Sequence, residues 1–358
     1  MDIAMDIDRQ PALDVPAARR CCYCWPFAGV LLLLLTSMLV AVMLGSVAVP
    51  HATLWQALWR GLRGETLETL ERIIWQIRLP RVLLAASVGA ALASSGAVYQ
   101  GVFRNPLADP YLLGAASGAG LGAALALVLL PRWQHALWGQ LGVSALAFVM
   151  AWLGVALVVL LARQGPLLPM VSLILAGVVV GSSFSAATSF LMLLDQSRAA
   201  SVLSWLLGSF ALAHWRSVAL LLPMVVAVLL ISQLAGRALN LLQLGEAAAA
   251  QLGLPVERFK LLMISIATLL TATAVSVSGI IGFVGLIVPH AVRLAIGADY
   301  RPLVPLAALL GATFMVLADL LARSLIAPAE LPVGIITTLV GGPFFLYLLK
   351  RQRHKGGL

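Results

Sequence analysis

The sequence has few charged side chains. They make up 10% of its 358 residues, whereas hydrophobic residues make up 61% and the mean hydropathy is +1.02. Because a soluble domain has roughly a quarter of its residues charged, this composition excludes an ordinary soluble protein and predicts an integral membrane protein. The net charge of +9 then indicates membrane topology rather than nucleic-acid binding, since cytoplasmic loops of membrane proteins are rich in lysine and arginine.

Lysine is the scarcest charged residue. Lys260, Lys350 and Lys355 are the only three, and none lies in the Gly-x-x-x-x-Gly-Lys-Ser/Thr loop that holds the phosphates of ATP. The sequence also shows no Ser-His-Asp or paired-carboxylate arrangement. We therefore expect no catalytic residue and no cofactor bound by this chain, and any ATP hydrolysis belongs to a separate polypeptide. A membrane enzyme is the disfavoured interpretation.

Metal-binding patterns are also missing. The three cysteines, Cys21, Cys22 and Cys24, lie close together before the first apolar run, but a tetrahedral site normally takes four ligands. The five histidines are scattered, with no pair three or four residues apart. His290 fills space after a proline in the simplest interpretation, with contact to a passing metal chelate as the alternative. We expect incidental thiols and no metal site.

Long apolar runs make up most of the chain. A membrane-spanning helix needs about 20 apolar residues, and ten candidate spans emerge, of which the eighth is too short to cross comfortably. Residues 196–213, with Trp205 and Trp215 nearby, indicate an interfacial helix instead. The predicted spans are 26–49, 80–103, 111–131, 136–162, 171–194, 215–236, 260–281, 283–297, 303–322 and 332–349.

These spans predict one transmembrane domain over residues 26–349, preceded by an N-terminal tail, 1–25, and followed by a basic tail, 350–358. The first span is too long for the apolar core of a signal peptide and no small-residue cleavage site follows it, so we expect an uncleaved anchor. An even number of spans puts both termini on one side. Lys350, Arg351, Arg353 and Lys355 place that side in the cytoplasm.

Acidic residues inside the spans are almost absent. Asp319 is the only one, and Arg323 follows it by one helical turn, so mutual neutralisation is its simplest role. The lack of other acids disfavours a carrier driven by protons or sodium ions. Arg78 and Arg81 flank Pro80 at the start of the second span with no acid nearby in sequence. They are either lipid headgroup anchors or a docking site for acidic groups.

A polar turn at residues 101–114 interrupts two apolar runs. Pro106 and Pro110 stop the preceding helix, and Asn105 and Asp109 can bond the backbone groups that the break leaves unpaired. So dense a turn between two spans predicts a functional segment rather than a simple connector.

A second distinctive stretch, residues 239–255, reads LNLLQLGEAAAAQLGLP. Gly245 divides one short helical piece from another, and Gly253-Leu254-Pro255 ends the second by C-cap chemistry. We expect two short amphipathic helices, outside the membrane on the cytoplasmic side, that expose a compact apolar face to a partner.

The chain resembles a known family through three co-linear motifs: Arg78-Leu79-Pro80-Arg81, the 101–114 turn, and the stretch Gly282-Phe283-Val284-Gly285-Leu286-Ile287-Val288-Pro289-His290. Over about residues 75–349 it is similar to the FecCD/BtuC-like permeases, the membrane subunits of type II ABC importers for ferric siderophores, haem or cobalamin. The resemblance implies an all-α polytopic bundle of ten spans whose two halves are inverted repeats.

The resemblance also implies an assembly. In this family two permeases pair around a central pathway in the bacterial inner membrane, two ATPase subunits attach in the cytoplasm, and a periplasmic binding protein docks outside. A homodimer in the lipid bilayer is therefore expected, with ATP bound only by the partner subunits. The implied site residues are Arg78, Arg81 and Arg323 for binding-protein docking, Asn105, Pro106 and Leu107 for a cytoplasmic gate, and Leu244, Gly245, Glu246, Ala249, Leu252 and Gly253 for ATPase coupling.

The cargo follows only from the resemblance. The lack of metal ligands suits carriage of a preformed complex, and a ferric siderophore or haem ranks ahead of cobalamin. From another class, a secondary transporter or channel is the alternative, and it would move its substrate without ATP.

Overall fold

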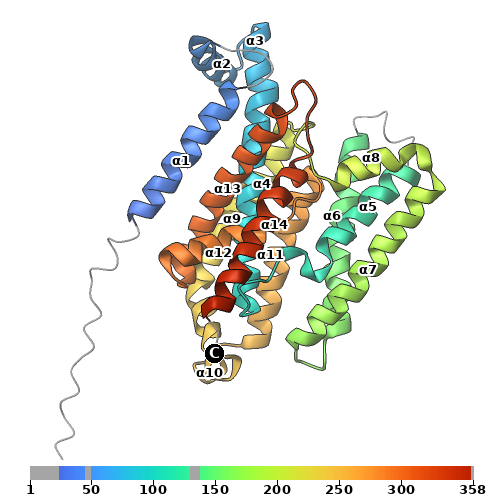
Figure 1. Ribbon diagram of the computed structural model, residues 1–358, viewed down its shortest axis with the longest axis vertical. Coiled ribbons are helices and arrows are strands. Elements are labelled where there is room, and N and C mark those ends of the chain that lie inside the picture. The colour runs from blue at the N-terminus through green and yellow to red at the C-terminus, as the bar shows by residue number, and fades with distance from the viewer. Residues whose placement is uncertain (1–23, 45–49, 130–137, 356–358) are drawn as a thin grey trace, which may run out of the picture.

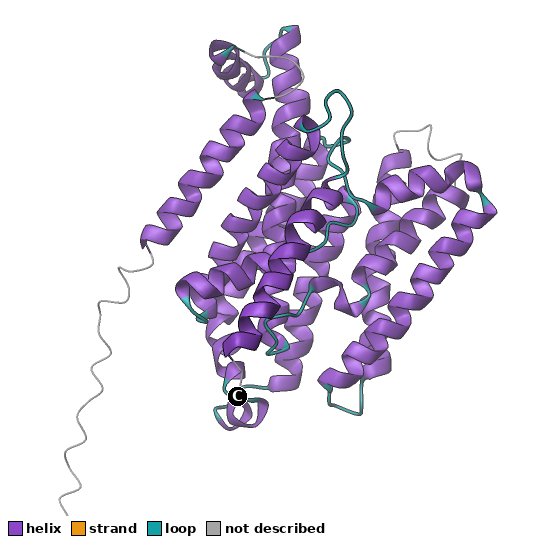
Figure 2. Ribbon diagram, viewed as in Figure 1, coloured by secondary structure: helices purple, strands orange, loops and turns teal. Residues whose placement is uncertain are grey.

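The computed structural model describes residues 24–44, 50–129 and 138–355, and the regular elements among them are helices (Figure 2). The first half contributes α1 (Cys24–Met43), α2 (His51–Arg63), α3 (Thr69–Arg72), the π-helical turn η3 (Ile73–Arg78), α4 (Leu79–Val102), the 3-10 turn η4 (Pro110–Leu113), α5 (Ala115–Leu129), α6 (Trp138–Ala162) and α7 (Met170–Leu194). The second half contributes α8 (Gln196–Leu206), α9 (Trp215–Gln243), α10 (Glu246–Gln251), α11 (Val256–Ser278), α12 (Val284–Ile296), α13 (Tyr300–Ser324) and α14 (Val333–Lys355).

The membrane crossings agree with the predicted all-α polytopic bundle. Within the described residues, seven helices are long and apolar enough to span a membrane. Three shorter apolar stretches, Ala115–Leu129, Val284–Ile296 and Val333–Leu346, bring the candidates to the ten that the sequence predicts.

The two ends of the bundle are distinct (Figure 1). α14 ends near α10, at what we call the α10 end, and α2 and α3 lie at the opposite α2 end, toward which α1 runs from a start that points away from it. The first and last spans therefore have their outer termini on the same side, as an even number of crossings requires.

α4 forms the centre of one group of helices. It is buried along nearly its whole length, including the polar side chains of Ser94, Ser95 and Gln100, and α9, α11, α12 and α13 pack around it (Figure 1). A Cβ atom on Gly96 would collide with the backbone of Gly285 in α12. Small residues at such contacts let helices approach closely in a membrane, where packing rather than hydrophobic burial drives association.

α5, α6, α7 and α8 form a second group beside the first (Figure 1). α7 is the least buried of the seven long spans: 17% of its most apolar window is buried, against 89% for the span that contains α4. Its exposed apolar side chains include Val171, Leu175, Val178, Phe190 and Leu193. α7 therefore presents a broad apolar face to lipid or to another chain.

Several boundaries differ from the sequence prediction, including the end of the first span, at Met43 rather than 49, and the start of the seventh, at Val256 rather than 260. The third span begins at Ala115 rather than 111, because residues Pro110–Leu113 form the turn η4. The sixth span, predicted at 215–236, continues to Gln243 because nothing in residues 237–243 breaks a helix. The stretch before Gly245 is therefore the end of α9 and not a separate short helix. The predicted interfacial segment 196–213 is helical only over α8.

Candidate functional site

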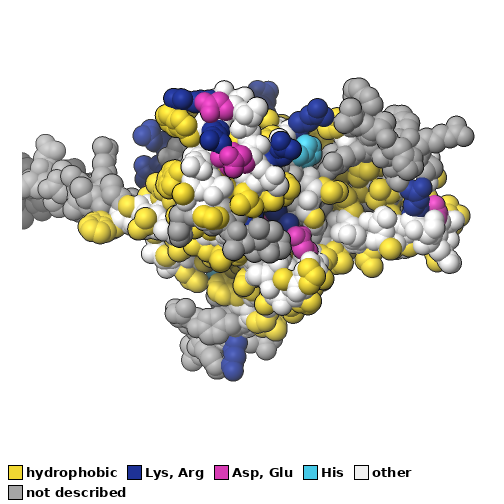
Figure 3. Space-filling view, turned by 90° about the horizontal axis from the view of Figure 1, so that it is seen from above, with side chains coloured by type: hydrophobic (Ala, Val, Ile, Leu, Met, Phe, Trp, Pro, Cys, Tyr) yellow, Lys and Arg dark blue, Asp and Glu magenta, His cyan; other side chains and the backbone are white. Residues whose placement is uncertain are grey.

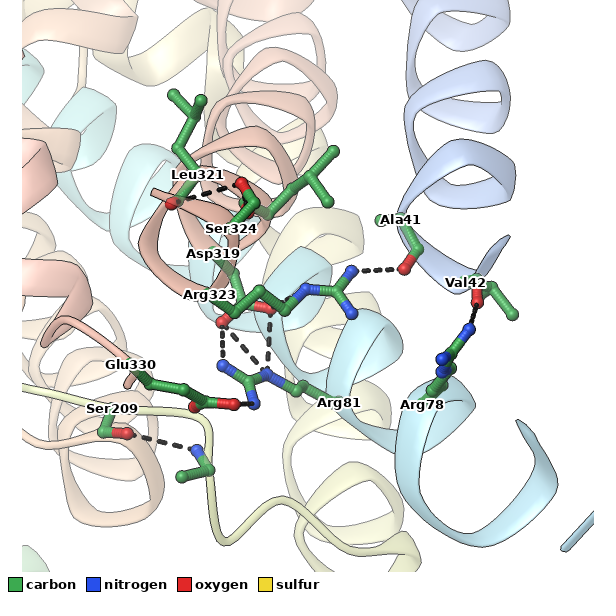
Figure 4. A network of polar contacts seen from close by, with 12 residues as sticks. Ala41, Val42, Arg78, Arg81, Ser209, Asp319, Leu321, Arg323, Ser324 and Glu330 are labelled. Atoms are coloured by element: carbon green, nitrogen blue, oxygen red, sulfur yellow. Dashed lines mark hydrogen bonds and ion pairs between the residues drawn. The ribbon is translucent and has the colours of Figure 1, made fainter. Parts of the chain in front are cut away.

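The α2 end contains a buried cluster of charged side chains, which Figure 4 shows from close by. Arg81, in the first turn of α4, donates from Nε and Nη2 to the carboxylate of Asp319 at 2.8–3.1 Å and from Nη1 to that of Glu330 at 2.9 and 3.0 Å. The side chains of Arg81 and Asp319 are 10% and 2% exposed, whereas that of Glu330 is 41% exposed. A planar guanidinium can serve two carboxylates at once, so Arg81 joins α4, α13 and the loop after α13.

Two further arginines hold α1 beside this cluster. Arg78 Nη1 donates to the carbonyl oxygens of Val42 and Met43 at 3.0 Å each, and Arg323 Nη2 donates to the carbonyl oxygen of Ala41 (Figure 4). These carbonyls belong to the last turn of α1, where a helix leaves acceptors without partners. A cation there also lies at the negative end of the helix dipole. Together the two arginines cap α1.

The prediction that Arg78 and Arg81 lack acidic partners is therefore wrong for Arg81. Its two acids follow it by 238 and 249 residues, too far for any local pattern to reveal them. Asp319 is predicted to be neutralised by Arg323, but Arg81 is its closer partner, since Arg323 Nε lies 3.7 Å away. The three arginines of the predicted docking site do lie together, although much of their surface is used inside the chain.

The α2 end also carries exposed charges. Arg60 Nη1 lies 3.1 Å from Glu71 and 3.6 Å from Glu68, and Arg63 lies 3.8 Å from Glu65. Figure 3, which looks down on this end, shows basic and acidic side chains scattered among apolar ones. Glu71 is buried and also accepts the backbone N–H of Glu68, so its pair with Arg60 is part of the local fold. The pairs with Glu68 and Glu65 are exposed and contribute little to stability, which leaves these charges available to solvent and to partners.

The 101–114 turn lies at the α10 end, between α4 and α5 (Figure 1). Asn105 Oδ1 accepts the backbone N–H of Leu107 at 2.9 Å, and Asp109 Oδ1 accepts that of Tyr111 at 2.7 Å. Both side chains thus bond the broken backbone, as the sequence predicts. Burial raises the pKa of Asp109 to about 6, against the opposing effect of the Tyr111 N–H.

The three predicted gate residues lie at the surface of this turn. Asn105 is exposed, and Pro106 and Leu107 are half-buried. The turn is anchored on its other side, because the Tyr111 hydroxyl donates to the carbonyl oxygen of Ile281 at 3.0 Å. The segment is thus fixed at Tyr111 and accessible at Leu107.

The predicted coupling residues form a hairpin around α10, residues 244–255, which we call the α10 hairpin. It projects past the ends of the spans (Figure 1). Leu244 and Leu252 are 66% and 62% exposed. Gly245 and Gly253, with φ of 112° and 88°, adopt conformations that only glycine reaches readily. They turn the chain into and out of α10.

Ala249 does not lie on the exposed face of the hairpin, contrary to prediction. It is fully buried and packs with Leu242 and Val256. α10 is too short for its sequence to show which face is apolar. Its consecutive alanines do not distinguish a buried position from an exposed one. The exposed apolar surface comes from Leu244 and Leu252 at the two ends of α10.

A polar network holds the base of the hairpin to the bundle. Asp299 Oδ1 accepts Asn240 Nδ2 at 2.7 Å, and Asn240 Oδ1 accepts the N–H of Tyr300 at 2.9 Å. Hydrogen bonds from the Arg301 side chain hold the pKa of Asp299 at about 2. Arg293 Nη2 donates to the Tyr300 hydroxyl at 2.9 Å. The end of α9 is therefore fixed against α12 and α13.

The described residues contain no group of three or more His, Cys, Asp or Glu side chains that could hold a metal ion. Cys21 and Cys22 lie outside the described residues, and Cys24 begins α1. His290 is 7% exposed, in α12.

Two cavities lie between the two helix groups. One of about 460 Å³ lies between α6, α9 and α11, and is mostly apolar; the other, of about 680 Å³, lies between α6, α8 and α11. None of the predicted site residues lines either cavity.

Comparisons with known proteins agree with this architecture. The FecCD transport family matches residues 32–351. The hemin transport system permease protein of Yersinia pestis is 40% identical over 339 residues, which cover 91% of this chain and 96% of that protein. The cobalamin import system permease protein of Halobacterium salinarum is 45% identical over 283 residues, which cover 79% of this chain and 74% of that protein.

The fold has a counterpart among solved structures. A metal-chelate type ABC transporter in an inward-facing conformation matches with a TM-score of 0.79 and 34% identity, over 91% of this chain and 99% of that one. The family match covers nearly the whole chain, and the relatives align over most of their own length. The protein therefore belongs to the FecCD transport family and is the membrane-spanning permease subunit of a type II ABC importer.

Proposed function

We propose that the protein is the homodimeric permease of an ATP-driven importer in the bacterial inner membrane, and that it translocates a ferric chelate, a siderophore complex or haem, delivered by a periplasmic binding protein. The α10 end faces the cytoplasm, so both termini are cytoplasmic, and the α2 end faces the periplasm. ATP is bound and hydrolysed by two separate ATPase subunits.

The observation that carries this proposal is the α10 hairpin. It stands outside the spans, is held at its base by the Asp299 network, and exposes Leu244 and Leu252. Exposed apolar side chains on a rigid projection fit a protein partner, and family membership supports an ATPase subunit as that partner. The broad apolar face of α7 supports a second permease copy in the same way.

The other two site assignments follow from position. Asn105, Pro106 and Leu107 form the cytoplasmic gate, which suits an accessible turn anchored on one side only. Arg78, Arg81 and Arg323 form the docking site for acidic groups of the binding protein. Because Arg81 already bonds Glu330, a docking carboxylate has to displace Glu330 or share the guanidinium with it.

The hemin permease relative, matched over 96% of its length, supports a ferric chelate as cargo. Cobalamin is the second candidate, favoured by the 45% identical cobalamin permease. No cofactor is assigned to this chain.

Reconstituted transport tests the proposal. The permease is purified with its cognate ATPase and binding protein and placed in proteoliposomes. Uptake of haem, ferrichrome and cyanocobalamin is then measured with ATP or a non-hydrolysable analogue. We expect ATP-dependent uptake of haem or ferrichrome. Uptake of cyanocobalamin alone would replace the cargo assignment, and uptake without ATPase or ATP would indicate a secondary transporter.

A further inference from the structure

A buried lysine lies where three segments meet at the α10 end. Lys260, in the first turns of α11, lies 2.7 Å from Glu257 Oε1 and 3.1 Å from Glu246 Oε2, and it donates to the carbonyl oxygen of Leu168 at 3.3 Å. Its side chain is only 4% exposed. An ammonium group has three donors and no acceptor, so these three partners use its full capacity.

Each partner belongs to a different part of the molecule. Glu246 opens α10 and is one of the predicted coupling residues, and Glu257 lies on α11 itself. Leu168 lies in the loop between α6 and α7, two residues before α7 begins at Met170. From α11, the Lys260 side chain therefore contacts both the hairpin and the loop that leads into α7.

Both backbone polar groups of Leu168 are hydrogen-bonded. Its carbonyl accepts from Lys260, and its N–H donates to Glu257 Oε2 at 2.9 Å. The loop before it is itself closed by two backbone bonds between Gln164 and Leu167, at 3.0 and 3.1 Å. A short, bonded loop passes on displacement better than a slack one, because it has few torsions left to absorb the movement.

We propose that Lys260 is a positioning residue of the importer, which links the α10 hairpin to the start of α7 so that movement imposed on the hairpin by the ATPase reaches α7. The inference rests on the proposed function, because it takes the hairpin as the ATPase contact. α7 is suited to respond, since it is the least buried of the seven long spans and can shift without disturbing the packing around α4.

A distance measurement tests the link without any need to know the cargo. Cysteines are placed at Val171, on the first turn of α7, and Ala250, on α10, both exposed, in a chain whose Cys21, Cys22 and Cys24 are replaced by serine. Spin labels at these positions report the distance in the permease–ATPase complex, without nucleotide and trapped with ATP and vanadate. We expect one narrow distance in both states of the unmodified site, and loss of that narrow distance in Lys260→Gln when nucleotide is trapped.

Control variants distinguish a Lys260 that links the hairpin to α7 from a Lys260 whose charge only stabilises the fold. Lys260→Arg keeps the cation and its donors and should restore the narrow distance. Lys350→Gln makes the same substitution at an exposed cytoplasmic lysine and should leave it unchanged. Where Lys260→Gln lowers the yield of folded complex, Glu246→Gln weakens the same link from the hairpin side and should broaden the distance as well.

Failure of the Lys260 link and failure of the proposed permease function give different results. A narrow, unchanged distance in Lys260→Gln, or in Glu246→Gln where that variant is used, overturns the link while leaving the permease assignment intact. Failure of the unmodified permease to bind an ATPase overturns the proposed function instead.

Discussion

The two ends of the bundle use the same device in different ways. At each end a buried cation lies between two carboxylates. At the α2 end Arg81 pairs with Asp319, 2% exposed, and Glu330, 41% exposed; at the α10 end Lys260 pairs with Glu257, 24% exposed, and Glu246, 43% exposed. The acids of Arg81 lie 238 and 249 residues away, whereas those of Lys260 lie 14 and 3 residues away. The acids of the first cluster lie far from Arg81 in sequence, whereas those of the second lie close to Lys260, whose distant partner is the carbonyl oxygen of Leu168, 92 residues earlier.

The choice of cation fits this difference. A guanidinium is planar and fixes two carboxylates in set directions, whereas an ammonium on a flexible stem tolerates rearrangement of its partners. The Arg81 cluster is therefore suited to hold α4, α13 and the loop after α13 in place. The Lys260 cluster is suited to keep contact while its partners move. The contacts of the α2 end therefore suit rigidity, and those of the α10 end suit the transmission proposed above.

Removal of Asp319, the buried acid of the α2 end, should have the largest effect. Asp319→Ala leaves Arg81 and Arg323 buried without their main partner, and breaking a buried pair costs about 3–5 kcal/mol. We expect a large fall in the melting temperature of the detergent-purified permease, followed by tryptophan fluorescence. Glu330→Gln, at a half-exposed acid, is the control. A loss in Asp319→Ala no larger than in that control would show that the cluster does not hold the helices.

The α10 hairpin offers a contrast between exposed and buried apolar residues. Leu252→Arg places a charge on the exposed face and should weaken ATPase binding by about 2 kcal/mol, roughly thirtyfold in Kd, without affecting the fold. Ala249→Arg has no room for its side chain and should destabilise the hairpin itself. Binding constants and melting temperatures of both variants separate the two effects. Equal ATPase affinity for Leu252→Arg and the unmodified permease would remove the hairpin from the interface.

Movement at the α10 end can be compared directly with rigidity at the α2 end. In the cysteine-free chain, Leu107→Cys should crosslink between protomers in the nucleotide state that closes the gate and react with maleimide in the state that opens it. Leu70→Cys, on α3, should react equally in all states. State-independent behaviour of Leu107→Cys would count against a gate at this turn.

The smallest expected effect lies at the half-exposed acid of the α2 end. Glu330→Gln removes the charge that competes for Arg81, so the binding protein should associate roughly twofold to fivefold faster at low ionic strength. High salt should abolish the difference, since exposed charges are screened. Association rates from surface plasmon resonance provide the measurement. Slower docking in Glu330→Gln would mean that Arg81 is not the docking cation.

Sequence reasoning succeeded where the cause is local. The crossing at Met170–Leu194 is predicted within one residue, because a bilayer demands a continuous apolar helix whose backbone bonds are satisfied internally. Asn105 and Asp109 bond backbone groups two residues away, as their position beside prolines predicts. The roles of the site residues in docking, gating and coupling came from family resemblance and stay predictions.

Sequence reasoning failed where two distant segments meet. The sequence predicts no acid beside Arg81 and an exposed Ala249, whereas Arg81 pairs with Asp319 and Ala249 is buried. Lys260 drew attention only as a lysine outside an ATP-binding loop, with nothing to connect it to Leu168, 92 residues earlier.

By itself the sequence determined that the protein spans a membrane, where most of its helices lie, and where the chain breaks between them. These follow from apolar length, proline and short-range hydrogen bonds, which act within a few residues. Only the tertiary structure decided which charges are paired, which face of the α10 hairpin is open, and which loop that hairpin touches. Those outcomes depend on how helices far apart in the chain pack against α4 and against each other. The spacing of apolar residues within one helix carries no information about that packing.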